Sequence, residues 1–138
     1  MIIADTGFWV ALASPRDNYH TLASLKFTQL QEPLISTWPV ITEVCHLLLK
    51  RQGIKAQTSF MRLYFRGVFQ AFPLEHKHSV RLIKLLEDYA DLPMDLADAS
   101  LVILAEELNH GRILSTDRRD FHTYRWKNTH PFTNLLVE

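Results

Sequence analysis

Four acidic side chains lie beside or within apolar stretches, where a carboxylate without a partner is unfavourable. Asp5 ends the short apolar run IIA, and Asp117 follows the apolar run ILS in ILSTDRRDF. Asp98 lies one turn into the apolar stretch 96–108, and Glu43 lies near the start of WPVITEVCHLLLK. Carboxylates about 4 Å apart repel each other by about 4 kcal/mol at an intermediate dielectric constant. If these four meet, protons or a divalent cation must relieve the repulsion.

The composition of the acidic set favours a hard cation. The chain has a single cysteine, Cys45, and its seven histidines show no zinc-like spacing, so we take them as surface or core residues. Carboxylate oxygens suit Mg²⁺ or Mn²⁺ better than zinc. Such an ion can activate a water and stabilise charge on a phosphate. Four acids are enough for one ion or for two.

The elements that must position these acids alternate along the chain. Short apolar runs bounded by Gly, Pro or polar residues predict strands, and longer periodic stretches predict helices, with Pro39 in the first turn of one and Asp95 as the N-cap of another. We predict strands at 2–4, 34–36, 68–72 and 112–115, a last short strand within 122–128, and helices at 8–13, 20–30, 39–51, 56–66, 78–90 and 96–108.

Strands that alternate with helices indicate a parallel sheet covered on both faces. The predicted fold is therefore α/β, a three-layer α/β/α arrangement around a central parallel sheet of four to five strands. At 138 residues, the size favours a single domain spanning 1–138. In such sheets ligands collect at the carboxyl ends of the strands, where the following helices also begin. Asp5, Glu43, Asp98 and Asp117 are thus expected on one rim.

Each acid also has an ordinary structural explanation. Asp5 could cap the helix after its strand, Glu43 could be a solvated residue favoured by the helix dipole, and Asp117 could be a turn residue. Asp95 is more readily explained as an N-cap, and Asp120 as a residue that braces its loop. Asp98 is the hardest to explain in this way, because it lies inside an apolar helix.

Two other functions use a similar aspartate. Asp5-Thr6-Gly7 is also the local signature of aspartic proteases, but those proteins are nearly all β and need two such aspartates, whereas this chain has one and several helices. Phosphatases of the haloacid dehalogenase type also begin with a strand-end aspartate. Their chemistry requires a second aspartate two residues on, where this chain has Gly7.

Composition places few limits on the partners. Fifteen basic and fifteen acidic residues cancel, so net charge neither indicates nor excludes nucleic acid. No apolar run approaches the ~20 residues of a membrane span, and the N-terminus lacks the pattern of a secretory signal. Together with the single Cys45, this favours a reducing cytoplasm and no contact with a membrane.

The ordered set of acids resembles the PIN-domain family of metal-dependent ribonucleases. The segments that carry the resemblance are IIADTGFWVAL, PVITEVCHLL, ADASLVILAEE and ILSTDRRDF, within about residues 1–128. The resemblance implies that the catalytic and metal-binding residues are Asp5, Glu43, Asp98 and Asp117, and that Thr116 is the hydroxyl residue often found before the last acid. Asp95 and Asp120 are further supporting candidates. The final segment TYRWKNTHPFTNLLVE departs from the expectation, because it lacks a clear strand pattern.

A free-standing PIN domain of this size resembles the VapC-like toxins of toxin–antitoxin pairs. The resemblance implies Mg²⁺- or Mn²⁺-dependent cleavage of RNA, a cognate antitoxin protein and a homodimer. Arg118 and Arg119 beside Asp117 are candidate RNA contacts. The Phe- and Arg-rich stretch 60–69 could be core, dimer interface or antitoxin groove. The alternative function is a non-catalytic module of the same fold that binds RNA or protein.

Overall fold

The computed structural model describes residues 1–137. Its elements alternate largely as the sequence pattern indicates. The helices are α1 (Thr6–Ala13), α2 (His20–Gln29), α3 (Trp38–Gln52), α4 (Ile54–Phe65), a 3₁₀ turn η1 (His76–His78), α5 (Ser79–Asp88), α6 (Leu96–Leu108) and α7 (Asp120–Thr123). The strands are β1 (Ile2–Ala4), β2 (Leu34–Thr37), β3 (Phe69–Phe72), β4 (Arg112–Leu114), β5 (Arg125–Trp126), β6 (His130–Pro131) and β7 (Thr133–Asn134).

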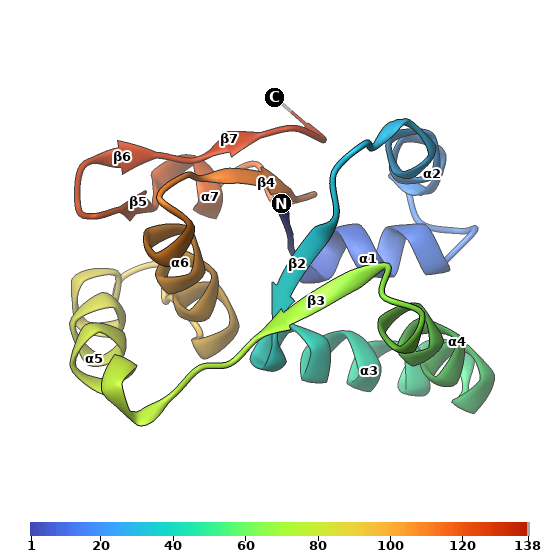
Figure 1. Cartoon of the computed structure of the whole chain (residues 1–138), viewed down its shortest axis with the longest axis horizontal. Helices are drawn as coiled ribbons and strands as arrows, with labels where there is room; N and C mark the ends of the chain where they lie inside the picture. Colours follow the sequence, from blue (N-terminus) through green and yellow to red (C-terminus); the bar gives the residue numbers. More distant parts are fainter. Residues whose placement is uncertain (138) are drawn as a thin grey trace.

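A five-stranded parallel sheet forms the centre of the molecule, which confirms the predicted fold class. Its strand order is β3-β2-β1-β4-β7, and every neighbouring pair is parallel. The helices α1 to α4 lie on one side of the sheet and α5 and α6 on the other (Figure 1). The central position of β1 puts its carboxyl end, and therefore Asp5, in the middle of the sheet edge.

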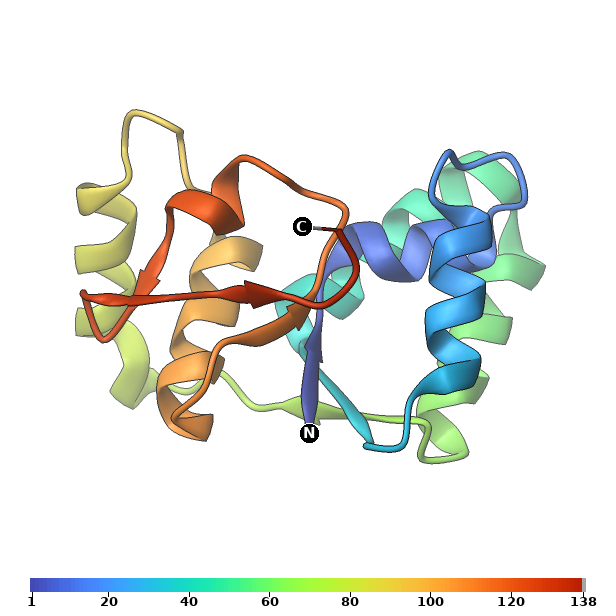
Figure 2. The ribbon, with the colours of Figure 1, turned by 90° about the horizontal axis from the view of Figure 1, so that it is seen from above.

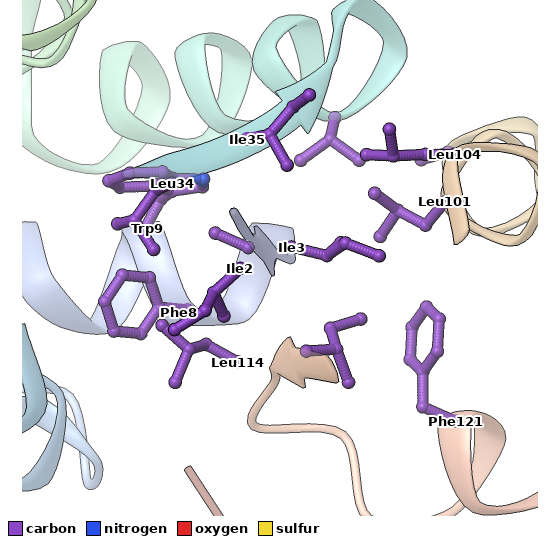
Figure 3. Close-up of a cluster of buried hydrophobic side chains, with 14 of the residues drawn as sticks. Ile2, Ile3, Phe8, Trp9, Leu34, Ile35, Leu101, Leu104, Leu114 and Phe121 are labelled. Carbon is purple, nitrogen blue, oxygen red and sulfur yellow. The ribbon is translucent and has the colours of Figure 1, made fainter. Parts of the chain in front are cut away.

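Side chains of the central strands alternate between two apolar layers, as the period of a strand requires. On one face, Ile2, Leu34 and Leu114 point toward Phe8 and Trp9 of α1 (Figure 3). On the other face, Ile3 and Ile35 point toward Leu101 and Leu104 of α6 (Figure 3). Both layers are fully buried, so the strands that carry the site have little freedom to move.

The helices that follow β2 and precede β4 begin at side-chain caps. The Thr37 hydroxyl accepts a hydrogen bond from the backbone N–H of Val40, with Pro39 in the first turn where its missing N–H costs nothing. Asp95 accepts from the N–H of Asp98 at 2.8 Å, as its N-cap prediction requires. These caps fix where α3 and α6 start, and hence where Glu43 and Asp98 lie.

The C-terminal segment differs from the prediction in one respect. The strand expected within 122–128 exists as β5, but it pairs antiparallel with β6 in a separate two-stranded sheet. The fifth strand of the central sheet is β7, paired with β4. Its residues, Thr133 and Asn134, carry no apolar pattern because this edge strand is short and half-exposed. Its register is fixed by backbone bonds such as Leu135 N–H to the carbonyl of Ile113, at 2.7 Å.

Among residues 1–137, no helix combines the length and the apolarity that crossing a bilayer requires.

Candidate active site

The four acids predicted from sequence come from four separate elements at the carboxyl edge of the sheet. Asp5 directly follows β1 and Asp117 follows β4, while Glu43 lies in the second turn of α3 and Asp98 in the first turn of α6. Figure 2 shows β1 and β4 running toward the same edge, where α1 begins and where the segment after β4 lies. The carboxylates influence one another electrostatically, since Asp117 and Glu43 act on Asp5, and Asp5 and Asp117 act on Asp98.

Asp5 is held by two donors in a buried position. Its Oδ1 accepts from the backbone N–H of Thr6 at 2.6 Å, and its Oδ2 accepts from the Ser115 hydroxyl at 2.8 Å. The pKa of Asp5 is raised from 3.8 to about 6, chiefly by burial and also by the charges of Asp117 and Glu43, while the two hydrogen bonds lower it in part. A buried carboxylate this costly to ionise indicates a role beyond capping α1.

Asp98 is the most strongly perturbed acid. Burial raises its pKa from 3.8 to about 8, with further contributions from the charges of Asp5, Asp95 and Asp117. The hydroxyl of Tyr124, a fully buried residue, donates to Asp98 Oδ2 at 2.8 Å and partly offsets the shift. Among residues 1–137, Asp98 Oδ1 has no protein donor, so one oxygen of this carboxylate is anchored and the other is available.

Asp117 is anchored in the same one-sided way. Its Oδ1 accepts from the backbone N–H groups of Arg119 and Asp120, at 2.9 and 2.8 Å. Its own N–H donates to the Ser115 hydroxyl at 2.9 Å, and that hydroxyl donates to Asp5. Ser115 therefore ties the ends of β1 and β4 together. Within the described part of the chain, Asp117 Oδ2 receives no protein donor.

The remaining predicted residues take varied positions. Glu43 is half-buried on α3, and Asp95 is exposed and caps α6. The Thr116 hydroxyl lies against Gly7, where any Cβ would overlap with it, so α1 and the segment after β4 approach closely only because residue 7 is glycine. Asp120 accepts from the Arg119 guanidinium at 2.9 Å and braces the loop, as predicted from sequence.

The donor set fits a hard divalent cation in its chemistry. The set consists of carboxylate oxygens. In both Asp98 and Asp117, one oxygen accepts a hydrogen bond from the protein and the other receives no protein donor among residues 1–137. The neighbouring Thr6 hydroxyl is buried and unpartnered among the described residues. The spacing is wider than a formed site, because no three His, Cys, Asp or Glu side chains of residues 1–137 lie close enough to hold an ion as they stand.

Comparison with known proteins agrees with this architecture. The PIN-domain profile matches residues 2–127. The chain belongs to the PIN-domain family. Ribonuclease VapC26 of Mycobacterium tuberculosis is 24% identical over 124 residues, which are 90% of this chain and 92% of that protein. The crystal structure of Mycobacterium tuberculosis VapC20, described as a sarcin-ricin loop cleaving toxin, matches with a TM-score of 0.80 at 18% identity, over 86% of this chain and 92% of that one.

Two residues that hold the acids of this PIN domain were not predicted from the sequence. Ser115 bridges Asp5 and Asp117, and Tyr124 anchors Asp98. Ser115 lies just before Thr116, which the family pattern singled out, so a serine at the end of a buried strand was the available signal. Tyr124 had no such signal, because it reaches Asp98 across 26 residues only through the packing of the C-terminal segment.

The two arginines predicted to contact RNA differ in their surroundings. Both are exposed. Arg119 forms an ion pair with Asp120 at 2.9 Å, whereas Arg118 has no hydrogen-bond or ion-pair partner among residues 1–137. They therefore are not equivalent candidates for binding a phosphate.

Proposed function

We propose that this PIN domain, spanning residues 1–138, is a divalent-metal-dependent endoribonuclease that hydrolyses RNA phosphodiester bonds as the toxin of a toxin–antitoxin pair. The observation that carries the proposal is the convergence of Asp5, Asp98 and Asp117 at one sheet edge, with the pKa of Asp5 raised to about 6 and that of Asp98 to about 8. The similarity to ribonuclease VapC26 along 90% of the chain supports the choice of RNA as substrate.

In the proposed site, Asp5, Asp98 and Asp117 would hold Mg²⁺ or Mn²⁺, and Glu43 would be a further ligand or the base that orients the attacking water. A bound ion of this kind supplies Lewis acidity and lowers the pKa of a coordinated water. The protein supplies orientation. Ser115 and the Thr6 N–H hold Asp5, the Tyr124 hydroxyl holds Asp98, and the backbone after Asp117 holds one of its oxygens.

The reaction adds water across the scissile phosphodiester. The water oxygen bonds to phosphorus, the bond from phosphorus to the 3′-oxygen breaks, and a proton ends on that oxygen, leaving a 5′-phosphate and a 3′-hydroxyl. Glu43 is half-buried, and its carboxylate has no hydrogen-bond partner among residues 1–137 that would hold it away from a water. Asp95 supports Asp98 through the cap of α6, while Thr116 and Asp120 shape the loop that carries Asp117.

The alternative is a non-catalytic PIN-like module that binds RNA or protein. The observation in its favour is the wide spacing of the acids among residues 1–137. The observation against it is the complete set of four acids, because two of them, Asp5 and Asp98, have strongly raised pKa values. A module without catalysis has no need of such groups.

The proposal includes two protein partners, the cognate antitoxin and a second copy of the chain. Exposed apolar side chains support protein contacts on α3 and α4, where Trp38, Leu49 and Phe65 border a hollow of about 690 Å³ and Phe65 is 88% exposed. The half-buried free thiol of Cys45, in the same hollow, accords with a reducing cytoplasm as the proposed location.

The homodimer is tested by the mass of the purified protein in solution, measured by light scattering. We expect a dimer for the wild type and a monomer for Phe65→Glu, because the charge would be buried in the apolar contact. A monomeric wild type, or a dimer that survives the substitution, would contradict this use of the α3–α4 surface.

The catalytic proposal is tested by incubating the purified protein with a mixed RNA pool in Mg²⁺, in Mn²⁺ and in EDTA, beside Asp98→Asn. We expect cleavage that requires the metal and is lost in the variant. Tight RNA binding without cleavage under either ion would favour the non-catalytic module instead.

A further inference from the structure

A hollow of about 320 Å³ adjoins the proposed catalytic edge and shares Asp117 with it. Its lining includes the polar residues Arg118, His122 and Thr133 and the aromatic residues Phe121 and Phe132. Phe121 is buried, while Phe132 is half-buried and packs edge-on against it, with ring centroids 5.3 Å apart. An aromatic floor, a polar rim and a carboxylate shared with the site are together the features of a small binding pocket.

The cations of the segment 112–127, which carries Asp117, are mostly committed to contacts within the protein. Arg112 forms a bidentate pair with Glu32 at 2.6 and 2.8 Å, and Arg119 pairs with Asp120. Arg125 donates to three backbone carbonyls, those of residues 122, 123 and 124, and Lys127 donates to Asn109 at 2.8 Å. Of these five cations, only Arg118 has no partner in the described chain, and it lies on the hollow.

The size and chemistry of the hollow select its occupant. Its volume is at the small end for a ligand pocket, so it suits one unpaired nucleotide and excludes a paired helix. Unpaired bases stack on aromatic rings, and Arg binds phosphate. Phe132 supplies the ring and Arg118 the guanidinium, and both line the hollow together with Asp117.

From this arrangement we propose that the hollow between α7 and β7 binds the nucleotide next to the scissile phosphodiester in single-stranded RNA, with its base against Phe132 and its phosphate on Arg118. The proposal rests on the proposed ribonuclease function and adds the place and the residues that hold the RNA strand. Arg119, its neighbour in sequence, has no part in it, because it does not line the hollow and its Nε is paired with Asp120.

The test measures binding rather than cleavage, so that it is separable from catalysis. In an Asp98→Asn background with Mg²⁺ present, a short fluorescein-labelled single-stranded RNA of mixed sequence is titrated with protein and followed by anisotropy. Adding Arg118→Ala should weaken binding about three- to tenfold and reduce the salt dependence by about one charge. Arg119→Ala, the matched control, should change affinity by less than about twofold.

A second variant and a crosslink keep the result independent of folding. Phe132→Leu retains an apolar side chain but loses the ring, and we expect binding to weaken about fivefold with unchanged circular dichroism. RNA carrying 4-thiouridine should crosslink, on irradiation, to residues of the hollow. Equal losses for the two arginine variants, or a crosslink confined to other elements, would overturn the nucleotide site and leave the ribonuclease proposal standing. An RNA that neither binds the variant nor is cleaved by the wild type in Mg²⁺ would overturn both.

Discussion

The two ends of α6 treat a carboxylate in opposite ways. Near its C-terminus, Glu106 receives a bidentate hydrogen bond from Arg81 of α5, with distances of 2.7 to 3.2 Å, and also accepts from the backbone N–H of Lys127 at 2.7 Å. Near its N-terminus, Asp98 receives one hydroxyl and faces the like charges of Asp5, Asp95 and Asp117. One acid is neutralised by the fold and the other is not.

This difference separates structural from functional charge within a single helix. Glu106 joins α5, α6 and the segment at β5, so its charge stabilises the packing of three elements. Asp98 destabilises the fold by its charge, since burial and repulsion both raise its pKa. A residue that costs stability without a compensating partner is the pattern expected of a catalytic or metal-binding group.

The largest expected effect is on cleavage. Asp98→Asn keeps the acceptor for Tyr124 but loses the charge, and we expect RNA cleavage in Mg²⁺ to fall on the order of 10³-fold. Glu106→Gln, at the other end of the same helix, should stay within about threefold of the wild type, because it lies outside the site. Rates of cleavage of a labelled RNA give the comparison. Equal losses in the two variants would contradict the division of roles.

For stability, we expect Glu106→Gln to be the more damaging of the two substitutions. Without divalent cations near pH 8, Asp98→Asn should raise the free energy of unfolding by about 1–3 kcal/mol, because it removes a buried charge that lacks a cation. Glu106→Gln should lower it by about 1–2 kcal/mol, since it weakens the contact with Arg81. Urea unfolding followed by fluorescence measures both. A destabilised Asp98→Asn would show that the acid is structural.

Tyr124 contacts only one of the two acids of α6, because its hydroxyl donates to Asp98 and not to Glu106. Tyr124→Phe keeps the ring packed on Tyr89 and Phe121 but removes the hydroxyl that donates to Asp98, so Mn²⁺ affinity should fall about tenfold. Tyr89→Phe is the matched control. It loses the bond that its hydroxyl accepts from the N–H of Arg125, yet leaves the carboxylates unchanged. Calorimetric titration with Mn²⁺ distinguishes them, and equal affinities for the two variants would remove Tyr124 from the site.

The pH dependence of stability gives the smallest expected effect. The folded-state pKa values of Asp5 and Asp98, about 6 and about 8, both lie above the ordinary 3.8. The folded state therefore binds protons that the unfolded state has already released, so the stability that these two groups contribute is fully present below about pH 4 and is lost as pH rises toward 8. Between about pH 6 and 8 the wild type should lose stability in EDTA, and Asp98→Asn should lose less, because most of the loss over this interval comes from Asp98. Stability that rises over this interval would contradict the shifts.

The parts of the fold that the sequence predicted well are those with long, regular patterns. The apolar periodicity of 96–108 with its Asp95 cap, and the apolar runs that became β1, β2, β3 and β4, were enough to derive the parallel sheet. The sheet then brought the acids to one edge, because parallel strands end on the same side. The order of strands and helices along the chain was therefore sufficient to predict that the acids meet at one edge.

The rest depended on contacts that no local pattern records. β7 is a polar edge strand of two residues, and it is defined by its backbone pairing with β4. Tyr124 reaches Asp98 because β5 and β6 fold the C-terminal segment back over α6, and Ser115 is distinguished from Thr116 only by the direction in which each hydroxyl points. The distinction between Arg118 and Arg119 likewise depends on which of them Asp120 pairs with.

The central claim is that the carboxylates at the edge of the sheet are kept without a protein cation because they bind a metal ion. The most direct measurement is a Mn²⁺ titration of the purified protein, read by the electron paramagnetic resonance signal of the free ion, for the wild type, Asp98→Asn and Glu106→Gln. The account predicts that the wild type and Glu106→Gln bind Mn²⁺ alike and that Asp98→Asn loses the binding. Equal binding by all three proteins, or none by the wild type, would contradict it.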